Sequence, residues 1–237
     1  MTLEILDSAG KLVRAFRSDD KPVTWPKDRD IPDYWIRPEQ VLSKSAGLHR
    51  FVWDLHYAPP LSQSASYPIS AVYANTWLEP RGPWAHPGTY TARLTANGKT
   101  MEQKFVVKLD PRVKATTAAM QSQFDLSMRA YAGMNEAMKT LDAVHATRKV
   151  VTEAASRETN AEKKKAIEAE NAKLQAFDQA GFARFNQQLG QILDQLQDSD
   201  DAPTTQLRAA FEERSKALND LLAAWPKADA AARAAIR

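Results

Sequence analysis

The sequence predicts an α+β protein with two domains: an immunoglobulin/fibronectin-like antiparallel β-sandwich at residues 1–110, followed by a three-helix up-down-up bundle at residues 111–237. Composition is the first observation. Five of the six Trp and 11 of the 13 Pro lie at or before Pro111, and proline is costly inside helices but frequent between strands. Periodicity is the second. Apolar residues alternate with polar ones before this point and recur at three- and four-residue steps after it.

Two β-hairpins are predicted in the first domain. Residues 2–7 alternate in polarity, and residues 11–16 form the return strand after a short turn. Residues 88–109 make the clearest hairpin, because two alternating runs flank Asn97-Gly98, the sequence typical of a tight hairpin turn. Alternation with a period of two indicates that one face of the sheet is buried and the other is wet.

A further strand is predicted at HRFVWDL, residues 49–55. Phe51, Trp53 and Leu55 would share one face, with Arg50 and Asp54 on the other. Together with the two hairpins, this strand shows the alternating pattern that is typical of a β-sandwich.

Two long connections, residues 17–46 and 56–87, interrupt the predicted strands. Connections of this length are uncommon in a compact domain unless they are packed or functional. Both are rich in proline and aromatic residues. We expect the aromatic side chains to fasten them against the sheets.

The second domain shows three apolar stripes with helical spacing. They run from Thr117 to about residue 154, from about residue 160 to residue 197, and from about residue 203 to residue 224. Pro203 suits the first turn of the third helix and Pro226 its end. Short polar breaks between the stripes favour an up-down-up arrangement.

The charge balance and the absence of cysteine exclude several classes of function. A net charge of +3 from well-mixed basic and acidic residues is too weak to indicate nucleic-acid binding. No apolar run is long enough to predict membrane insertion. The chain has no Cys, which excludes disulfides and thiolate chemistry. No signal peptide is visible, and the strand rhythm from residue 2 suggests a fragment of a longer protein.

Residues 18–25 partly match the Asp-box turn of sialidase-type propellers, Ser-x-Asp-x-Gly-x-Thr-Trp. Ser18, Asp20, Thr24 and Trp25 fit, but Pro22 stands in place of the glycine. The tight turn needs an unusual φ angle at the glycine position, and proline cannot adopt that angle. Such boxes recur once per propeller blade, and this sequence has one. We interpret the match as coincidental.

The sequence gives no complete set of catalytic or metal-binding residues. His49 and His56 lie seven residues apart, which would place them on opposite faces of a strand, and His86 and His145 have no partner at zinc-ligand spacing. No Gly-x-Ser-x-Gly elbow or phosphate-binding glycine loop occurs. We therefore predict no catalytic site, no metal and no cofactor. A glycoside hydrolase with its site in residues 56–87 remains an alternative. Asp54, Glu79 and residues 28–33 are candidates for its carboxylates, and the sequence singles out no pair among them.

Aromatic residues in the second connection provide a different alternative, a carbohydrate-binding module. Tyr57, Trp77 and Trp84 are the candidate binding residues, because exposed aromatic rings can stack on sugars. They can equally cap the core of the sandwich.

Three segments together resemble a known arrangement: HRFVWDL, RGPWAHPGTYTARLTANGK and FVVKLDPRVK. The chain resembles the C-terminal region of bacterial sortilin-like, BNR-repeat β-propeller "glycosyl hydrolase" proteins. In these, a propeller is followed by an immunoglobulin-like sandwich similar to that of FlgD and then by a helical tail. The resemblance covers most of residues 2–125 and implies a periplasmic or secreted location. This chain contains no propeller, so no propeller site can be assigned to it.

The function predicted from the sequence is that of a non-catalytic accessory region. The sandwich would be a rigid docking unit, and the bundle would pack against a protein partner. This partner is a β-propeller domain, another subunit such as a second copy of the chain, or a cell-surface protein. A glycan is the ligand in the carbohydrate-binding alternative.

Overall fold

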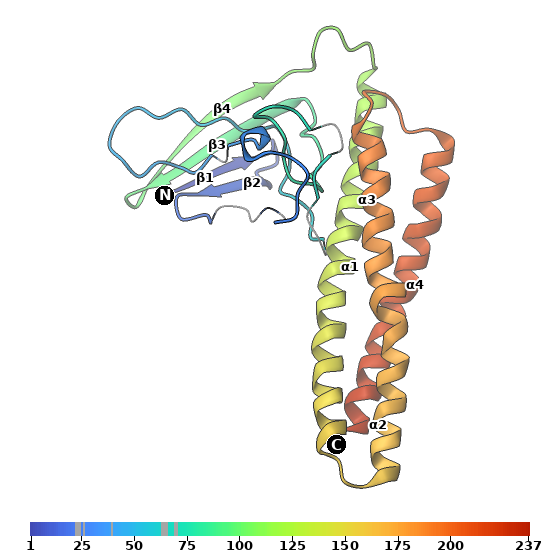
Figure 1. Cartoon of the computed structure of the whole chain (residues 1–237). Helices are drawn as coiled ribbons and strands as arrows, with labels where there is room; N and C mark the ends of the chain where they lie inside the picture. The colour runs from blue at the N-terminus through green and yellow to red at the C-terminus, as the bar shows by residue number, and fades with distance from the viewer. Residues whose placement is uncertain (22–24, 26, 39, 63–65, 69–70) are drawn as a thin grey trace. The chain divides into compact units, whose positions relative to one another are not determined.

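The computed structural model describes residues 1–21, 25, 27–38, 40–62, 66–68 and 71–237. The chain divides into two compact units. The sheet unit consists of Met1–Pro60, Ser64–Asp125 and Ser199–Ala202, and the helical unit of Leu61–Gln63, Leu126–Asp198 and Pro203–Arg237. Figure 1 shows the four strands of the first and the long helices of the second. The prediction of a mixed fold, with an antiparallel sheet followed by helices, is confirmed.

The sheet is antiparallel with the strand order β2-β1-β3-β4. Its strands are β1 (Thr2–Leu6), β2 (Leu12–Arg17), β3 (Gly88–Ala96) and β4 (Lys99–Val107). Both predicted hairpins are therefore confirmed. Asn97 and Gly98 join β3 to β4 with φ angles of 51° and 73°, the left-handed pair that a type I′ turn requires. Between β1 and β2, Asp7 Oδ1 accepts hydrogen bonds from the backbone N–H groups of Ala9 and Lys11, both at 2.9 Å.

One face of the sheet is polar. The Arg93 Nε atom on β3 donates to Glu102 Oε1 on β4 at 2.6 Å, and its Nη1 atom lies 3.7 Å from Glu4 Oε2 on β1. Thr95 and Thr100 share a hydroxyl hydrogen bond of 3.0 Å on the same face. These cross-strand contacts leave the residues of alternate position, such as Ile5 and Tyr90, on the opposite face.

Residues 49–55 do not form the predicted strand. Leu55 has a φ of 60°, outside the extended region, and the segment has no ladder partner in the range described. Its aromatic residues cover the apolar face of the sheet directly. The Phe51 ring lies 4.7 Å from Phe16, and the Trp53 ring 5.6 Å from Tyr90, between ring centroids. The alternation that we interpreted as a strand reflects a loop whose aromatic residues turn toward the sheet.

The helices follow β4 in the chain. They are α1 (Thr117–Arg157), α2 (Ala161–Leu174), the 3₁₀ turn Gln175–Phe177, the π segment Asp178–Ala183, α3 (Arg184–Gln197) and α4 (Thr205–Ala235). Side chains cap two of the starts: Asn160 accepts from the Lys163 N–H at 3.0 Å and Thr204 from the Leu207 N–H at 3.1 Å. The second predicted helix is thus interrupted between Leu174 and Arg184.

Two prolines do not act as predicted. Pro203 precedes the N-cap residue Thr204 and is not in the first helical turn. Pro226 lies inside α4 and does not end it. A proline inside a helix costs about 3 kcal/mol or more. The helix nevertheless continues because Ala232, beyond the proline, is completely buried in one cluster with Val151 and Ile167.

The interior of the helical unit is divided into two apolar clusters. The larger contains Leu126, Ala130, Met134, Ala137, Met138, Leu141, Val144, Phe182, Ala183, Phe185, Leu189, Ile192, Leu193, Leu196, Phe211 and Leu218. The smaller contains Val151, Ala155, Ile167, Leu174 and Ala232. Trp225 packs against both.

Candidate functional site

The two long connections of the sheet unit contact each other. Ile36 pairs with Thr76 in an isolated parallel bridge. The Trp25 and Tyr67 rings lie 6.2 Å apart, and the Tyr67 hydroxyl accepts from the Asp30 backbone N–H at 2.8 Å. We expected the aromatic residues of these connections to pack on the sheet. These pairs instead fasten one connection to the other.

Near the end of the second connection, the guanidinium group of Arg81 lies against two indole rings. Arg81 Cζ is 3.8 Å from the ring centroid of Trp77 and 5.3 Å from that of Trp84. Its Nη2 atom is also 3.8 Å from Asp54 Oδ2. Burial lowers the pKa of Arg81 to about 10, so the group keeps its charge at neutral pH. The negative faces of the indoles and the carboxylate stabilise that charge.

A buried histidine lies beside this stack. His56 is 2% exposed, and its ring centroid lies 3.7 Å from that of Trp84. Its Nδ1 is 2.7 Å from the carbonyl oxygen of Gly82. A carbonyl only accepts, so Nδ1 carries the proton of this contact. Burial, and then the charge of Arg81, lowers the pKa of His56 to about 4, which makes the ring neutral at physiological pH.

The backbone crossing that holds this cluster requires a glycine. The Tyr57 N–H donates to Pro83 O at 2.9 Å, and the Ala85 N–H to Leu55 O at 2.7 Å. Gly82 lies where these segments approach. A Cβ atom there would lie 2.4 Å from the carbonyl oxygens of both Tyr57 and Ala58, closer than real Cβ contacts. The absence of a side chain at Gly82 therefore permits the crossing.

The three residues predicted to bind a carbohydrate occupy different environments. Tyr57 is buried, with its ring 5.9 Å from Phe124, and its carbonyl accepts from Arg14 at 2.7 Å. Trp77 is half-buried with a ring face against Arg81. Trp84 is 43% exposed. The structure brings Trp77 and Trp84 together through Arg81, whereas the Tyr57 ring belongs to the interior.

The two carboxylates predicted for a hydrolase lie near the same cation. Asp54 pairs with Arg81 and also accepts from the His56 backbone N–H at 3.3 Å. The negative charge of Glu79 likewise raises the pKa of Arg81. The backbone of Glu79 exchanges two hydrogen bonds with Ser66, of 2.8 and 3.0 Å. Both residues thus contribute to the order of the second connection.

The remaining sequence motifs lie outside this cluster. His49 Nε2 is 2.9 Å from Ser45 O, and His86 Nδ1 is 2.9 Å from Pro87 O. Across residues 1–21, 25, 27–38, 40–62, 66–68 and 71–237, no three His, Asp or Glu side chains form a group that could hold a metal ion. The Asp-box match includes Pro22 and Thr24, which lie outside the described residues.

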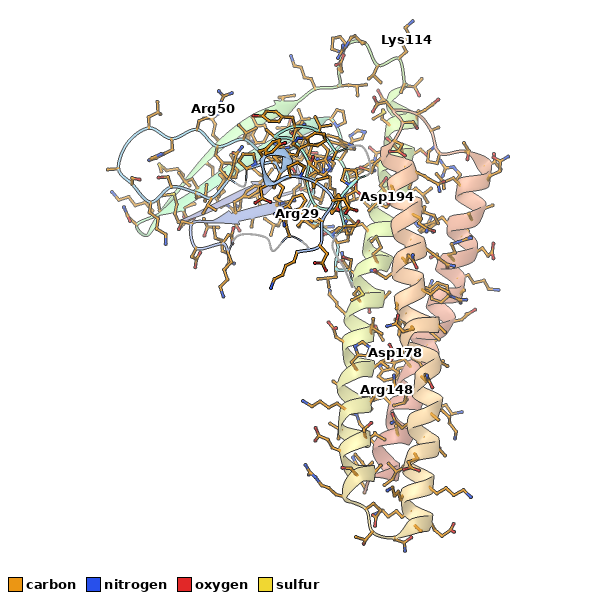
Figure 2. All side chains as sticks on the ribbon, viewed as in Figure 1. Arg29, Arg50, Lys114, Arg148, Asp178 and Asp194 are labelled. Carbon is orange, nitrogen blue, oxygen red and sulfur yellow. The ribbon has the colours of Figure 1, made fainter. Side chains whose placement is uncertain are left out.

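A second charged cluster lies in the helical unit, at the interruption between α2 and α3. Asp178 is buried at the start of the π segment. Its Oδ1 is 2.9 Å from His145 Nε2, and Arg148 Nη1 donates to its Oδ2. Figure 2 labels Asp178 and Arg148 at the same level of the helices. Both partners of Asp178 come from α1.

Further polar side chains complete this level. The Thr147 hydroxyl donates to Asp229 Oδ1 at 2.6 Å and accepts from Arg233 Nη2 at 2.7 Å. Arg233 also pairs with Asp229 at 2.9 Å. On α1, Val144 belongs to the larger apolar cluster and Val151 to the smaller, so these groups lie between the two. We call this set the polar layer: His145, Thr147, Arg148, Asp178, Asp229 and Arg233.

Sequence reasoning missed the central residue of each cluster. Arg81 lies four residues after Trp77 and three before Trp84, and this grouping of an arginine with two tryptophans was an available signal. Asp178 lies within an apolar stripe at a buried position. An isolated acidic residue in such a stripe predicts a paired charge.

Comparisons of the chain with protein-family models, with curated proteins and with solved structures found no match. In the described part of the chain, no helix combines the length and the apolar character needed to cross a membrane.

Proposed function

We propose that this chain is a non-catalytic accessory region that docks to a protein partner. The partner class is a β-propeller domain of the sortilin-like, BNR-repeat proteins that the sequence resembles. In this proposal, the sheet unit corresponds to the immunoglobulin-like module that follows the propeller. Helices α1, α2–α3 and α4 correspond to the helical tail, and they run up, down and up.

The supporting observation is how the chemically capable side chains of the second connection are engaged. The Arg81 guanidinium lies against Trp77 and Trp84 and beside Asp54. His56 is buried and neutral. Such contacts order a loop, whereas a catalytic group must reach a substrate. An ordered surface favours docking, because its loops lose little conformational entropy when a partner binds.

The direct test measures affinity between the purified chain and a recombinant propeller domain of this class, by biolayer interferometry. Two exposed valines form a matched pair of variants. Val150 lies on α1 in the helical unit, and Val106 lies on β4 at the edge of the sheet. If the helical unit docks, Val150→Glu lowers affinity about tenfold through an unpaired charge in the interface. Val106→Glu leaves it unchanged.

The reverse pattern would move the docking surface to the sheet. A chain that binds no propeller domain and stays monomeric in light scattering would contradict the proposal. A chain that self-associates, with the association lost in Val150→Glu, would assign the same surface to a second copy.

The carbohydrate-binding alternative retains one supporting observation, the exposure of Trp84. Loss of glycan binding in Trp84→Ala would favour it. The hydrolase alternative predicts turnover of aryl glycosides that Glu79→Gln or Asp54→Asn abolishes. An inert purified chain would remove it.

A further inference from the structure

Two tyrosine rings stand exposed where the long connections meet. Tyr34 is 64% exposed and Tyr73 is 69% exposed. Their ring centroids lie 6.1 Å apart, and the ring planes meet at 49°. Val72 beside them is exposed as well. Single exposed apolar residues are ordinary, but a group of them indicates a contact surface.

The backbone beneath these rings is tightly fastened. The Ala74 N–H donates to Tyr34 O at 3.3 Å, and the Thr76 N–H donates to Trp35 O at 3.1 Å. Thr76 is almost completely buried, and its hydroxyl exchanges two hydrogen bonds of 2.8 Å with the backbone of Val72. The two rings are therefore presented by a supported pair of loops, which lowers the entropy cost of using them for binding.

Polar side chains flank the rings in sequence. Asp33 precedes Tyr34 and is exposed, with Arg29 as its ion-pair partner; Figure 2 labels Arg29. Asn75 follows Tyr73 by two residues and is also exposed. A carboxylate accepts hydrogen bonds only, whereas an amide and a phenol can both donate and accept.

We propose that the surface formed by Tyr34 and Tyr73 binds the pyranose ring of a neutral glycan. The positively polarised C–H face of a pyranose packs against the negative face of an aromatic ring. Its hydroxyl groups supply both donors and acceptors, which suit Asp33 and Asn75. This site goes beyond the docking proposal, since its residues are separate from α1.

The flanking chemistry favours a sugar over the other ligands that stack on aromatic rings. A proline-rich peptide brings few N–H donors for the carboxylate of Asp33, because proline has no backbone N–H. A nucleic acid would bring its phosphates near the same carboxylate. A neutral pyranose has hydroxyl donors for Asp33 and carries no charge that the carboxylate would repel.

The test uses saturation-transfer NMR on the full chain with a panel of neutral mono- and disaccharides at millimolar concentration. Sugars that respond are then titrated against variants. We expect Tyr34→Ala and Tyr73→Ala each to weaken binding about tenfold, and the double variant to abolish it. Tyr34→Phe keeps the ring and should stay within about threefold. Trp84→Ala, in the other aromatic cluster, should leave binding unchanged.

Thermal melting of each variant checks that the sheet unit remains folded. The proposal is overturned if no saccharide gives a response, if binding survives the double variant, or if Trp84→Ala removes it. Binding of a proline-rich peptide that the double variant loses, without any sugar response, would assign the surface to a peptide and overturn it too. Affinity for a propeller domain should not change in these variants, so this proposal and the docking proposal can fail separately.

Discussion

Each unit holds a charged side chain away from most of the solvent, partly buried for Arg81 in the sheet unit and buried for Asp178 in the helical unit, and the two units stabilise that charge differently. In the sheet unit, Arg81 lies against the aromatic faces of Trp77 and Trp84 with one carboxylate at 3.8 Å. In the helical unit, the Asp178 carboxylate is paired with the Arg148 guanidinium and lies within hydrogen-bond distance of the His145 ring.

The difference follows from the surrounding backbone. Irregular loops cannot satisfy their own backbone groups as helices do, and flat aromatic rings supply large contact areas that suit an irregular path. Helices present side chains at fixed positions, so an ion can meet its partners from a neighbouring helix. The stack around Arg81 depends on the shape of its side chain, whereas the pairs around Asp178 depend on charge.

Removing the buried carboxylate should have the largest effect. Asp178→Ala leaves Arg148 partly buried without its partner, and we expect a loss of about 3 kcal/mol in the free energy of unfolding. Urea titration followed by circular dichroism at 222 nm measures it in the helical unit. Asp142→Ala is the control, because Asp142 is exposed on α1, the helix that carries His145 and Arg148, and this change should alter stability by less than about 0.5 kcal/mol. Equal effects would show that the pairs around Asp178 contribute nothing.

The neutral histidine of the sheet unit should make stability depend on pH. The folded-state pKa of His56, about 4, lies below its ordinary value of 6.5. The unfolded chain therefore takes up the proton first, and stability present above pH 6.5 is lost as pH falls toward 4. We expect a loss of about 2 kcal/mol by pH 4.5.

Tryptophan fluorescence monitors this titration, because five of the six tryptophans precede Pro111. His56→Asn keeps an N–H donor for Gly82 without the titrating group. Its stability should fall less between pH 7 and pH 4.5 than that of the unmodified chain. Parallel profiles would contradict the assignment of the pH dependence to His56.

A methyl group at the backbone crossing should destabilise the sheet unit. In Gly82→Ala the new Cβ meets two carbonyl oxygens at 2.4 Å, and small-to-large changes in packed sites cost about 1–3 kcal/mol. The matched control is Gly88→Ala, whose Cβ would have its nearest neighbour at 3.8 Å. Guanidinium titration followed by fluorescence compares them. A Gly82→Ala protein as stable as Gly88→Ala would mean that the crossing is looser than described.

The smallest expected change in stability compares the contribution of side-chain shape at Arg81 with that of charge at Arg148. Arg81→Lys keeps the charge but loses the planar group that stacks on Trp77, and we expect a cost of about 1 kcal/mol. Arg148→Lys keeps a cation beside Asp178 and should cost less. The two changes are compared in the same urea titrations, with fluorescence for the first and circular dichroism for the second. A larger cost at Arg148 would reverse the comparison.

Local patterns in the sequence were enough to predict the two hairpins and the helical second part. Asn97-Gly98 has the backbone preference that its turn uses. The predicted strand at residues 49–55 was wrong because Phe51 and Trp53 alternate along an extended loop in the same way as side chains alternate along a strand. Whether such a segment finds a hydrogen-bonded neighbour depends on distant parts of the chain.

Local sequence patterns also did not predict the interruption of the second helix. Leu174, Phe177 and Phe185 keep an apolar spacing that continues across the π segment, so the periodicity hides it. The candidate site was partly accessible: Trp77 and Trp84 were selected, but the role of Arg81 between them depends on contacts that no spacing rule gives. Pro226 was expected to end the helix because proline is costly inside a helix, but the packing of Ala232 beyond it offsets that cost.

The polar layer also determines how the helices come apart. Cooperative melting spreads through continuous apolar contact, and in the helical unit that contact is divided between two clusters bridged by Trp225. Amide hydrogen exchange should therefore resolve two blocks of protection, one around Phe182 and Leu193 and a weaker one around Ile167 and Ala232. Opening of the weaker block would leave the rest of the unit closed.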